Sequence, residues 1–341
     1  MGIKVGVIGA GSWGTTLGKL LAEKGDDVTI WSYTQGPAND INERKENKDF
    51  LPGIILPDNL TATSDLHSAC EGKDLILSIS PSHTVRGILE KARDAIDTKS
   101  LIVSASKGIE EDTLKTMSDV FHEVLGVERA RKVTYLSGPS FAKEVSLKAP
   151  TAVSAACADI NIAKKVQGLF STNYFRVYSC TDVIGVELGG ALKNVIAIAA
   201  GIADGLGFGY NTRAAIITRG LNEISRLGVS MGAEPITFLG LAGLGDLVLT
   251  CTGDLSRNRS VGLRIGHNEK LKDVLASMKM VAEGVNTSKA AYRLSIAKKI
   301  EMPITKEVYL TLYEDKPPIE SVKDLMTRDL KEEFSGFVQK Y

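Results

Sequence analysis

The sequence predicts an α/β protein in which an N-terminal doubly wound, mostly parallel sheet precedes an all-helical C-terminal domain. In the first half, short β-branched runs alternate with helical patterns, the order that builds βαβ units with right-handed crossovers. After about Thr181, strand patterns almost vanish and long helical patterns with Gly-rich joints replace them. A glycine-rich turn joins the first predicted strand to the first predicted helix, as is typical of doubly wound sheets. We therefore expect two domains, residues 1–180 and 181–341.

The individual strands are predicted from short runs rich in Val, Ile and Leu that end in turn residues. Five runs are expected to form the parallel part of the sheet: Ile3–Ile8, Val28–Trp31, Leu75–Ser80, Leu101–Ser104 and Val133–Leu136. Two more runs, Thr151–Ala156 and Phe175–Tyr178, are expected to extend it. Helices are predicted between the strands at Thr15–Lys24 and Val85–Ala95, and the polar segment Ser32–Phe50 is expected to be a loop with a short helix. In the second domain the predicted helices are Val183–Ala203, Thr212–Leu227, Pro235–Leu241, Leu271–Ser277 and Thr287–Ala297.

The composition excludes several classes of protein. The 341 residues include 41 basic and 41 acidic side chains, so the formal net charge is zero, which argues against nucleic acid as the main partner. We expect no secretory leader and no membrane span, because the longest mostly apolar run, Ile236–Cys251, is too short for one. The cysteines form no C-x-x-C pair and are expected to be free thiols in a reducing cytoplasm: Cys70, Cys157, Cys180 and Cys251.

The glycine-rich turn Gly9–Gly14 has the spacing G-x-G-x-x-G. Alone this pattern is weak, but here it follows a predicted strand and opens a predicted helix, which is the context of a Rossmann-type dinucleotide site. Gly9 allows the tight turn, Gly11 lets a pyrophosphate approach the backbone, and Gly14 lets helix and strand pack closely. The free N–H groups at the helix start then favour the phosphates. The alternative is a glycine turn without a ligand.

The ribose of such a dinucleotide is read at the end of the second strand, about 20 residues further on. That end is Trp31-Ser32-Tyr33-Thr34, which offers neither a carboxylate for the NAD ribose nor an arginine for a 2′-phosphate. Tyr33 is expected to stack on the adenine. The sequence therefore predicts a site for NAD or NADP without choosing between them.

Polar residues at the carboxyl ends of three further strands are expected to line the same crevice, because ligands of open α/β sheets bind outside that edge. Lys107 lies in the segment Ser104–Glu110, and Ser140 lies in the turn Ser137–Ala142. Ser80-Pro81-Ser82 follows a third strand. For Lys107 the alternative is a solvated lysine at a strand end.

Lys193 is the single cation in the apolar helical stretch Glu187–Gly201. A stretch that is apolar on nearly every face is buried, and burial pushes the pKa of a lysine towards neutrality, where the amine can act as a general acid or base. Gly189 lies one helical turn before Lys193 and is expected to leave room for a ligand. The alternatives are a lysine that reaches solvent or one that pairs with Glu187 or Asp204.

Three more features of the second domain are candidates for a polar site. Asp246 lies in the Gly-rich turn Gly243–Leu247, where the alternative is a helix N-cap. Ser256-Arg257-Asn258-Arg259 combines guanidinium forks, which match phosphate oxygens, with two polar side chains, and the alternative is a solvated run of charge. Glu283, before Gly284, is a candidate cofactor contact or an ordinary residue at a helix end.

Taken together, these motifs resemble the bacterial-type NAD(P)-dependent glycerol-3-phosphate dehydrogenases over nearly the whole chain. The resemblance is specific because many motifs occur in the family's order. They are Gly9–Thr15, Asn47–Pro52, Ser106–Glu110, Ser137–Ala142, Glu187–Gly201, Asn211–Gly220, Gly243–Cys251, Ser256–Arg259 and Glu283–Val285.

The resemblance implies a role for each matching residue. With the glycine fingerprint, the residues expected to bind the dinucleotide are Gly9, Gly11, Ser12, Trp13, Gly14, Tyr33, Lys107, Ala142, Arg257, Val281 and Glu283. Those expected to bind substrate are Lys107, Gly138, Ser140, Lys193, Asn194, Asp246, Ser256, Arg257 and Asn258. Lys193 would be the proton donor and acceptor, and Arg257 and Asn258 would hold the substrate phosphate. The family often has His or Arg where Tyr33 and Thr34 stand, which leaves the choice of NAD or NADP open.

The reaction implied is the interconversion of sn-glycerol 3-phosphate and dihydroxyacetone phosphate, supplying glycerol 3-phosphate for phospholipid synthesis. Hydride transfer is expected in the cleft between the domains, without a metal ion. A 3-hydroxyacid or 6-phosphogluconate dehydrogenase is one alternative, since those enzymes also resemble this chain in a Gly-rich helix with Lys and Asn. A dinucleotide-binding redox sensor without catalysis is another. Whether the chain is a monomer or a homodimer stays open.

Overall fold

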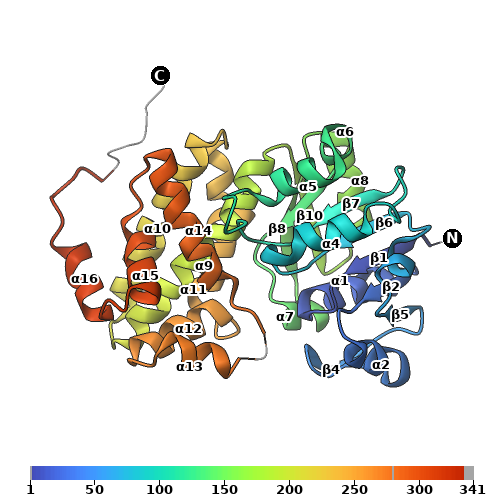
Figure 1. The fold of residues 1–341 in the computed structure, drawn as a ribbon, viewed down its shortest axis with the longest axis horizontal. Coiled ribbons are helices and arrows are strands. Elements are labelled where there is room, and N and C mark those ends of the chain that lie inside the picture. Colours follow the sequence, from blue (N-terminus) through green and yellow to red (C-terminus); the bar gives the residue numbers. More distant parts are fainter. Residues whose placement is uncertain (1, 279, 334–341) are drawn as a thin grey trace. The chain divides into compact units, whose positions relative to one another are not determined.

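The computed structural model of this chain describes residues 2–278 and 280–333 (Figure 1). Its contacts divide the chain into two compact units. The sheet unit comprises the residues up to Lys107 together with Lys115–Val186. The helical unit comprises Gly108–Leu114 and the residues from Glu187 onward.

The sheet unit is built on one eight-stranded sheet in the order β10-β9-β8-β7-β6-β1-β2-β5. All neighbouring strands in it are parallel except β8 and β9, which are antiparallel. The prediction of a doubly wound, mostly parallel sheet is therefore confirmed. The strands are β1 (Lys4–Ile8), β2 (Asp27–Trp31), β5 (Leu60–Thr63), β6 (Leu75–Ser78), β7 (Leu101–Ser104), β8 (Thr134–Ser137), β9 (Thr151–Ala156) and β10 (Phe175–Cys180).

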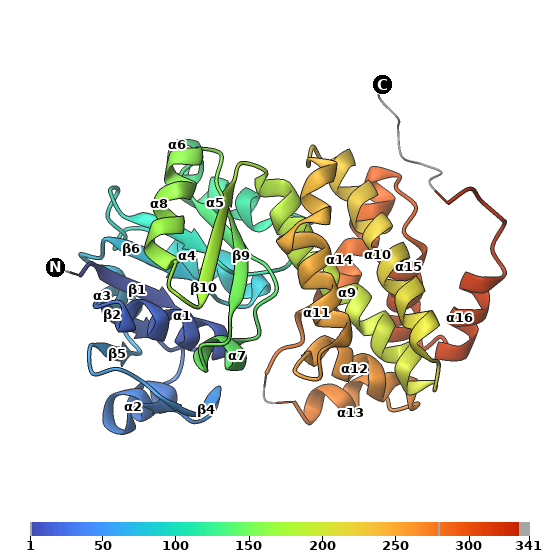
Figure 2. The same cartoon turned by 180° about the vertical axis from the view of Figure 1, so that it is seen from behind.

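Helices cover both faces of this sheet, so its strands are apolar on both sides (Figures 1 and 2). In β6, Leu75 and Leu77 belong to one hydrophobic cluster and Ile76 to the other. This alternation follows from the two-residue period of a strand, and each fully buried aliphatic side chain contributes roughly 1.5–3 kcal/mol. The helices of the unit are α1 (Ser12–Glu23), α2 (Gln35–Arg44), α3 (Leu66–Cys70), η1 (Ser82–Thr84), α4 (Val85–Ala92), α5 (Met117–Leu125), α6 (Val127–Ala130), α7 (Ala142–Ser146) and α8 (Ile160–Phe170).

The sheet unit differs from the prediction mainly between β2 and β6. β5 pairs with β2 as an additional edge strand, and its sequence, Leu-Thr-Ala-Thr, contains a single large apolar residue. α2 is the short helix expected within Ser32–Phe50. It is followed by a small antiparallel pair, β3 (Glu46–Asn47) and β4 (Leu51–Ile55), which the sequence did not predict.

The helical unit has α9 (Val183–Gly205) as its most apolar helix. Among the described residues, α9 is the one helix long and apolar enough to cross a membrane, but 78% of its most apolar window is buried inside the structure, as in a core helix. From the sequence, Ile236–Cys251 was expected to be the longest mostly apolar run. That segment divides into a 3₁₀ turn, a π-helical turn and a short α-helix.

The remaining elements of the helical unit confirm the predicted helical character. Three predicted helices are found with shifted ends: α10 (Tyr210–Ser230), α13 (Leu271–Ala276) and α14 (Glu283–Lys298). The run predicted at Pro235–Leu241 is the 3₁₀ helix η2 (Pro235–Leu239). The elements not predicted are the π-helical turn η3 (Leu241–Gly245) and the helices α11 (Asp246–Thr252), α12 (Arg257–Gly266), α15 (Pro303–Tyr313) and α16 (Pro318–Met326).

Candidate active site

The glycine fingerprint of the sheet unit forms the turn between β1 and α1. Gly9 has φ +129°, and a Cβ placed on it would lie 2.3 Å from the carbonyl oxygen of Ile79. A Cβ on Gly14 would lie 1.9 Å from the carbonyl oxygen of Gly9. Gly11 is different, because a Cβ there would meet nothing within 4 Å. Gly9 and Gly14 are thus required by the turn, whereas the space over Gly11 fits the close approach of a pyrophosphate.

The N-terminus of α1 lies next to that space. Gly11 is its N-cap residue and has no side chain to accept from the first turn, which also contains no acidic residue. Unsatisfied N–H groups and the positive end of the helix dipole favour an anion at this position. The residues present therefore fit the phosphates of a dinucleotide.

Asn47 of β3 is hydrogen-bonded to the glycine turn and to the start of α1. Its Nδ2 donates to the carbonyl oxygen of Ala10 and to Oγ1 of Thr15, both at 2.8 Å, and the side chain is fully buried. Close by in the sequence, the carbonyl oxygen of Phe50 accepts a hydrogen bond of 2.5 Å from Ser12 Oγ. The segment Asn47–Pro52 was singled out by the resemblance alone, and no pattern in it indicated a contact with the glycine turn.

The end of β2 leaves the choice of dinucleotide open, as predicted. Tyr33 is 85% exposed and meets Trp31 edge to face, with ring centroids 6.3 Å apart. Thr34 is the N-cap residue of α2, and no acidic residue stands in the first turn of that helix. Neither a carboxylate nor a guanidinium therefore occupies positions 31–34.

Lys107, Gly138 and Ser140 come together at the carboxyl ends of β7 and β8. Lys107 Nζ lies 3.5 Å from the carbonyl oxygen of Gly138, which also accepts from Ser140 Oγ at 2.9 Å. Gly138 has φ +145°, and a Cβ there would lie 2.8 Å from the Cα of Val153, so only glycine fits. The sequence argument from strand ends correctly placed these residues at one edge of the sheet.

Two further contacts connect this edge with the first turn. Ser106 Oγ donates to the carbonyl oxygen of Ser80 at 2.7 Å, which joins the ends of β7 and β6. Thr16 Oγ1 of α1 donates to the carbonyl oxygen of Ala142, the first residue of α7, at 3.2 Å. The segments predicted to bind the dinucleotide are thus linked by hydrogen bonds within the sheet unit.

In the helical unit, Lys193 of α9 forms an ion pair and hydrogen bond with Asp246, the first residue of α11. Lys193 is 7% exposed and Asp246 is 1% exposed. Burial disfavours the charged amine and the adjacent carboxylate favours it, so Asp246 supports an ammonium group in an apolar helix. Asp204, one of the partners that the sequence suggested for Lys193, pairs with Arg213 and Arg259.

The π-helical turn η3 brings Asp246 to Lys193. Gly189 lies one turn before Lys193, and a Cβ on it would lie 2.5 Å from the carbonyl oxygen of Ala242 in η3. The missing side chain of Gly189 therefore gives space to a neighbouring backbone, whereas the sequence analysis had reserved that space for a ligand. Thr250 Oγ1 donates to the carbonyl oxygen of Asp246 at 2.6 Å. Single π turns of this kind are frequent at functional sites.

Asn194 and Asn258 join three helices beside the ion pair. Asn258 Nδ2 of α12 donates to Asn194 Oδ1 of α9 at 2.9 Å, and Asn258 Oδ1 accepts from the backbone N–H of Gly284 in α14 at 2.9 Å. A Cβ on Gly284 would lie 2.6 Å from the carbonyl oxygen of Asn194. Each asparagine amide has two N–H groups, so both side chains retain donor capacity for an anion after these contacts.

Arg257 lies next to Asn258 in the first turn of α12. Its guanidinium has no hydrogen-bond partner among the residues that the structure describes, and desolvation lowers its pKa while the nearby charge of Glu283 raises it. Ser256 caps this helix by accepting from the backbone N–H of Arg259 at 3.2 Å. A charged arginine at a helix N-terminus, with a hydroxyl beside it, forms a suitable site for a phosphate.

The comparisons with known proteins agree with this arrangement. Residues 4–163 match the family model described as the N-terminus of NAD-dependent glycerol-3-phosphate dehydrogenase, and residues 182–323 match the model of its C-terminus. The chain belongs to the NAD-dependent glycerol-3-phosphate dehydrogenase family. The chain is therefore an NAD(P)-dependent oxidoreductase, as the sequence predicted.

Curated relatives and a solved structure match over almost the whole length. A glycerol-3-phosphate dehydrogenase (NAD(P)+) of Geobacter sulfurreducens is 58% identical over 333 residues, which are 98% of this chain and 99% of the relative. A relative of the same name from Leptospira biflexa is 55% identical over 331 residues, 97% of this chain and 99% of the relative. The crystal structure of the glycerol-3-phosphate dehydrogenase of Coxiella burnetii has a TM-score of 0.91 and 39% identity, covering 96% of this chain and 99% of that one.

For this family member, the structure places the predicted residues in two sets, one in each unit. The sheet unit holds Gly9, Gly11, Ser12, Trp13, Gly14, Tyr33, Lys107, Gly138, Ser140 and Ala142. The helical unit holds Lys193, Asn194, Asp246, Ser256, Arg257, Asn258, Val281 and Glu283. Trp13 packs against Phe175, with ring centroids 6.3 Å apart, and Val281 is 41% exposed. Sequence reasoning placed Asn47, Arg213 and Arg259 in motifs but missed their contacts, which are those of Asn47 with the glycine turn and those of the two arginines with Asp204.

Proposed function

We propose that the chain interconverts sn-glycerol 3-phosphate and dihydroxyacetone phosphate, with Lys193 as the group that exchanges a proton with the C2 oxygen. The observation that carries this proposal is the buried ion pair of Lys193 with Asp246. The next residue of α9, Asn194, accepts a hydrogen bond from Asn258, which follows Arg257 in α12. One helix bundle thereby presents a proton donor for a ketone and a cationic anchor for a phosphate. Dihydroxyacetone phosphate carries both a ketone and a phosphate, and the phosphate distinguishes it from an ordinary ketone.

In ketone reduction, bound NADH or NADPH supplies the hydride. The Lys193 ammonium donates a hydrogen bond to the carbonyl oxygen and transfers a proton to it as negative charge develops. Asp246 stabilises the ammonium before transfer and orients the amine. In the oxidation of glycerol 3-phosphate, the neutral amine of Lys193 accepts the proton of the C2 hydroxyl.

Phosphate binding by Arg257 and Asn258 is proposed to position the reacting carbon. Arg257 contributes charge, and Asn258 contributes an amide N–H. Holding the phosphate reduces the motion of the ketone, and this can lower the barrier without direct contact with the reacting atoms. Lys107, Gly138 and Ser140 are proposed as further substrate contacts, with Lys107 also touching the dinucleotide.

The dinucleotide is proposed to bind along the glycine turn, with the pyrophosphate over Gly11 and the adenine near Tyr33. Ser12, Trp13 and Ala142 would line this site, and Arg257, Val281 and Glu283 would contact the nicotinamide half. The two units would then correspond to a dinucleotide-binding domain and a substrate-binding domain. The absence of acidic and basic groups at positions 31–34 supports use of both NAD and NADP.

The proposal is tested by steady-state assay of NADH and NADPH oxidation with dihydroxyacetone phosphate. Turnover with this substrate is expected. In the opposite direction, NAD+ or NADP+ reduction is expected with sn-glycerol 3-phosphate and not with a 3-hydroxyacid or 6-phosphogluconate. Activity with a hydroxyacid pair alone would favour the alternative dehydrogenase class. Dinucleotide binding without any turnover would favour a redox sensor.

Three wider aspects of the function are also proposed. The reaction would run in the cytoplasm and supply glycerol 3-phosphate for phospholipid synthesis, as the resemblance implies. The helical unit exposes large apolar side chains at Tyr210, Ile236 and Leu239, which supports a homodimer. Light scattering coupled to gel filtration distinguishes a dimer from a monomer.

A further inference from the structure

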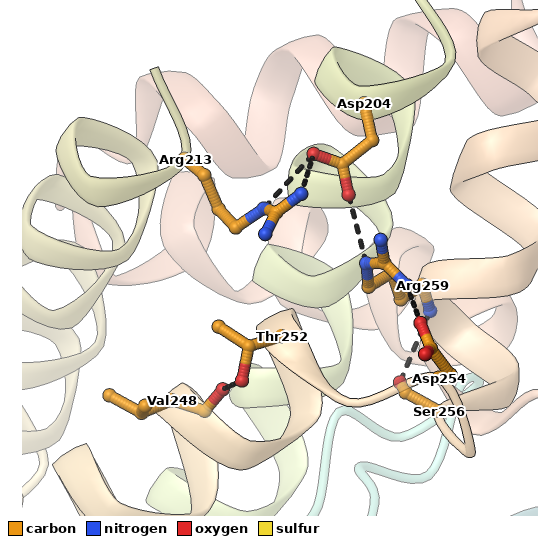
Figure 3. A network of polar contacts seen from close by, with 7 residues as sticks. All are labelled: Asp204, Arg213, Val248, Thr252, Asp254, Ser256 and Arg259. Atoms are coloured by element: carbon orange, nitrogen blue, oxygen red, sulfur yellow. Dashed lines mark hydrogen bonds and ion pairs between the residues drawn. The ribbon is translucent and has the colours of Figure 1, made fainter. Parts of the chain in front are cut away.

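Arg259, the last residue of the Ser256–Arg259 motif, has no role in the function proposed above, yet it is the most extensively paired cation of that turn. Its Nε donates to Asp204 Oδ2 at 2.8 Å and its Nη1 donates to Asp254 Oδ1 at 2.9 Å (Figure 3). Asp204 lies at the end of α9, on the same helix as Lys193. The other oxygen of Asp204 accepts from Nε and Nη2 of Arg213 at 3.0 and 2.7 Å.

Asp204 and its two arginines are largely buried, whereas Asp254 is 96% exposed. The side chain of Asp204 is 7% exposed, and those of Arg259 and Arg213 are 15% and 20% exposed. Both carboxylate oxygens of Asp204 are used, and each by a guanidinium, which makes the bonds charge-assisted. Removing the carboxylate would leave two arginines without their main partner.

The backbones of α9 and α12 touch directly beside this network. A Cβ on any of four glycines, two on each helix, would lie 2.1 to 2.5 Å from a carbonyl oxygen of the other helix. Such distances leave no space for a side chain, so each helix fixes the position of the other. The contacts are Gly201 with Arg259, Gly205 with Leu263, Gly262 with Ile198 and Gly266 with Ile202.

Two adjacent residues of α12 are hydrogen-bonded to two side chains that lie far apart along α9. Asn258 binds Asn194, and Arg259 binds Asp204. Asn194 and Asp204 are separated by about 15 Å along the helix axis at 1.5 Å per residue. A turn held at two such points resists both sliding along α9 and rotation about its own axis.

The pairing also separates the roles of the two arginines of the turn. Arg259 is neutralised by Asp204 and Asp254, whereas Arg257 has no hydrogen bond among the described residues. Without Asp204, Arg259 would be released close to the phosphate anchor, and the turn would lose one of the two side-chain hydrogen-bonded contacts that supplement the backbone packing of α12 on α9.

We propose that Asp204 and Arg259 are positioning residues, which hold the phosphate-binding turn of α12 at a fixed place relative to Lys193. The inference rests on the proposed function, because it assumes that Arg257 and Asn258 bind the phosphate. In dihydroxyacetone phosphate the ketone carbon and the phosphate are joined by a short linker. A shift of the turn therefore misplaces the ketone relative to the amine of Lys193.

The test compares two substrates that share the ketone and differ in the phosphate. For Asp204→Asn we expect kcat/KM with dihydroxyacetone phosphate to fall at least tenfold, with part of the loss in kcat. With dihydroxyacetone, which has no phosphate to be positioned, kcat/KM should change less than twofold, and the Kd for NADH should be unchanged. Glu269→Gln is the matched control, since it removes the carboxylate that pairs with Arg264 of the same helix and should leave both substrates unaffected.

A second pair of variants covers the case in which Asp204→Asn fails to fold. Arg259→Ala should show the same defect restricted to the phosphorylated substrate, and Arg259→Lys should restore part of the rate because it keeps a charge opposite Asp204. Equal losses with both substrates would leave the preference for the phosphorylated substrate unchanged, make the network merely structural and overturn the inference. Unchanged kcat/KM with both substrates would overturn it as well. The proposed function fails separately, if the unmodified enzyme does not reduce dihydroxyacetone phosphate.

Discussion

Asn47 provides the sharpest prediction for dinucleotide binding, because its side chain is fully buried and supports the glycine turn from behind. Asn47→Ala removes two hydrogen bonds of 2.8 Å, to the carbonyl oxygen of Ala10 and to Oγ1 of Thr15. Each neutral hydrogen bond contributes about 0.5–1.5 kcal/mol net, so the turn loses about 1–3 kcal/mol of support. If the loss falls on the dinucleotide-binding conformation, the Kd for NADH rises about 5- to 140-fold, at 1.4 kcal/mol per factor of ten.

The assay is titration of the purified variant with NADH by calorimetry, with Asn42→Ala as the matched control. Asn42 also makes two backbone hydrogen bonds of 2.8 Å in the sheet unit, to the carbonyl oxygen and N–H of Ala62, but it does not touch the glycine turn. Asn42 is exposed and Asn47 is buried, so we expect a smaller stability loss for Asn42→Ala, and weaker NADH binding in Asn47→Ala alone. Equal NADH affinity in both variants would refute the reasoning.

Three further outcomes follow from the site and from one buried carboxyl group. Gly11→Ala should fold normally, since its Cβ meets nothing within 4 Å, yet it should weaken NADH binding at least tenfold in the same titration. Gly14→Ala should instead lower the thermal midpoint of unfolding, because its Cβ would lie 1.9 Å from the carbonyl oxygen of Gly9. Tight NADH binding by Gly11→Ala would contradict the proposed pyrophosphate site. Arg257→Ala should raise KM for dihydroxyacetone phosphate at least tenfold and affect dihydroxyacetone less in steady-state kinetics; equal effects would exclude a phosphate contact. Burial raises the pKa of Glu223 from 4.5 to about 7, so the native state holds a proton that the unfolded state has lost, and stability falls as pH rises from 4.5 to about 7. The free energy of unfolding is measured with urea at pH 5 and at pH 8, and Glu223→Gln should reduce the difference between the two values by about 3 kcal/mol. An unchanged difference would show that Glu223 is not its source.

The sheet and its ligand-binding edge could be predicted from the sequence because their signals are local. The alternation of Leu75, Ile76 and Leu77 between two hydrophobic clusters is visible as a short aliphatic run. Strand ends then place Lys107 and Ser140 at one edge. β5 was missed because a four-residue edge strand with two threonines buries too little apolar surface to leave a pattern.

The partner of Lys193 could not be predicted, because helical spacing indicates only neighbours on the same helix. Asp246 reaches Lys193 across the π-helical turn η3, and the approach depends on Gly189 admitting the backbone of Ala242. Asp204, which the sequence offered as a partner of Lys193, binds two arginines instead. Contacts between distant segments depend on packing, which residue spacing in one segment does not encode.

The account's central claim is that Lys193 exchanges the proton during turnover, and Lys193→Ala tests it most directly. The kcat for reduction of dihydroxyacetone phosphate should fall at least about 100-fold, the lower end for loss of a general acid, while the Kd for NADH stays near that of the unmodified enzyme. Lys316→Ala is the control, because Lys316 is also a largely buried lysine of the helical unit and pairs with Glu307 and Asp324. A Lys193→Ala enzyme that keeps most of its kcat would contradict the account and leave Lys193 as a structural residue.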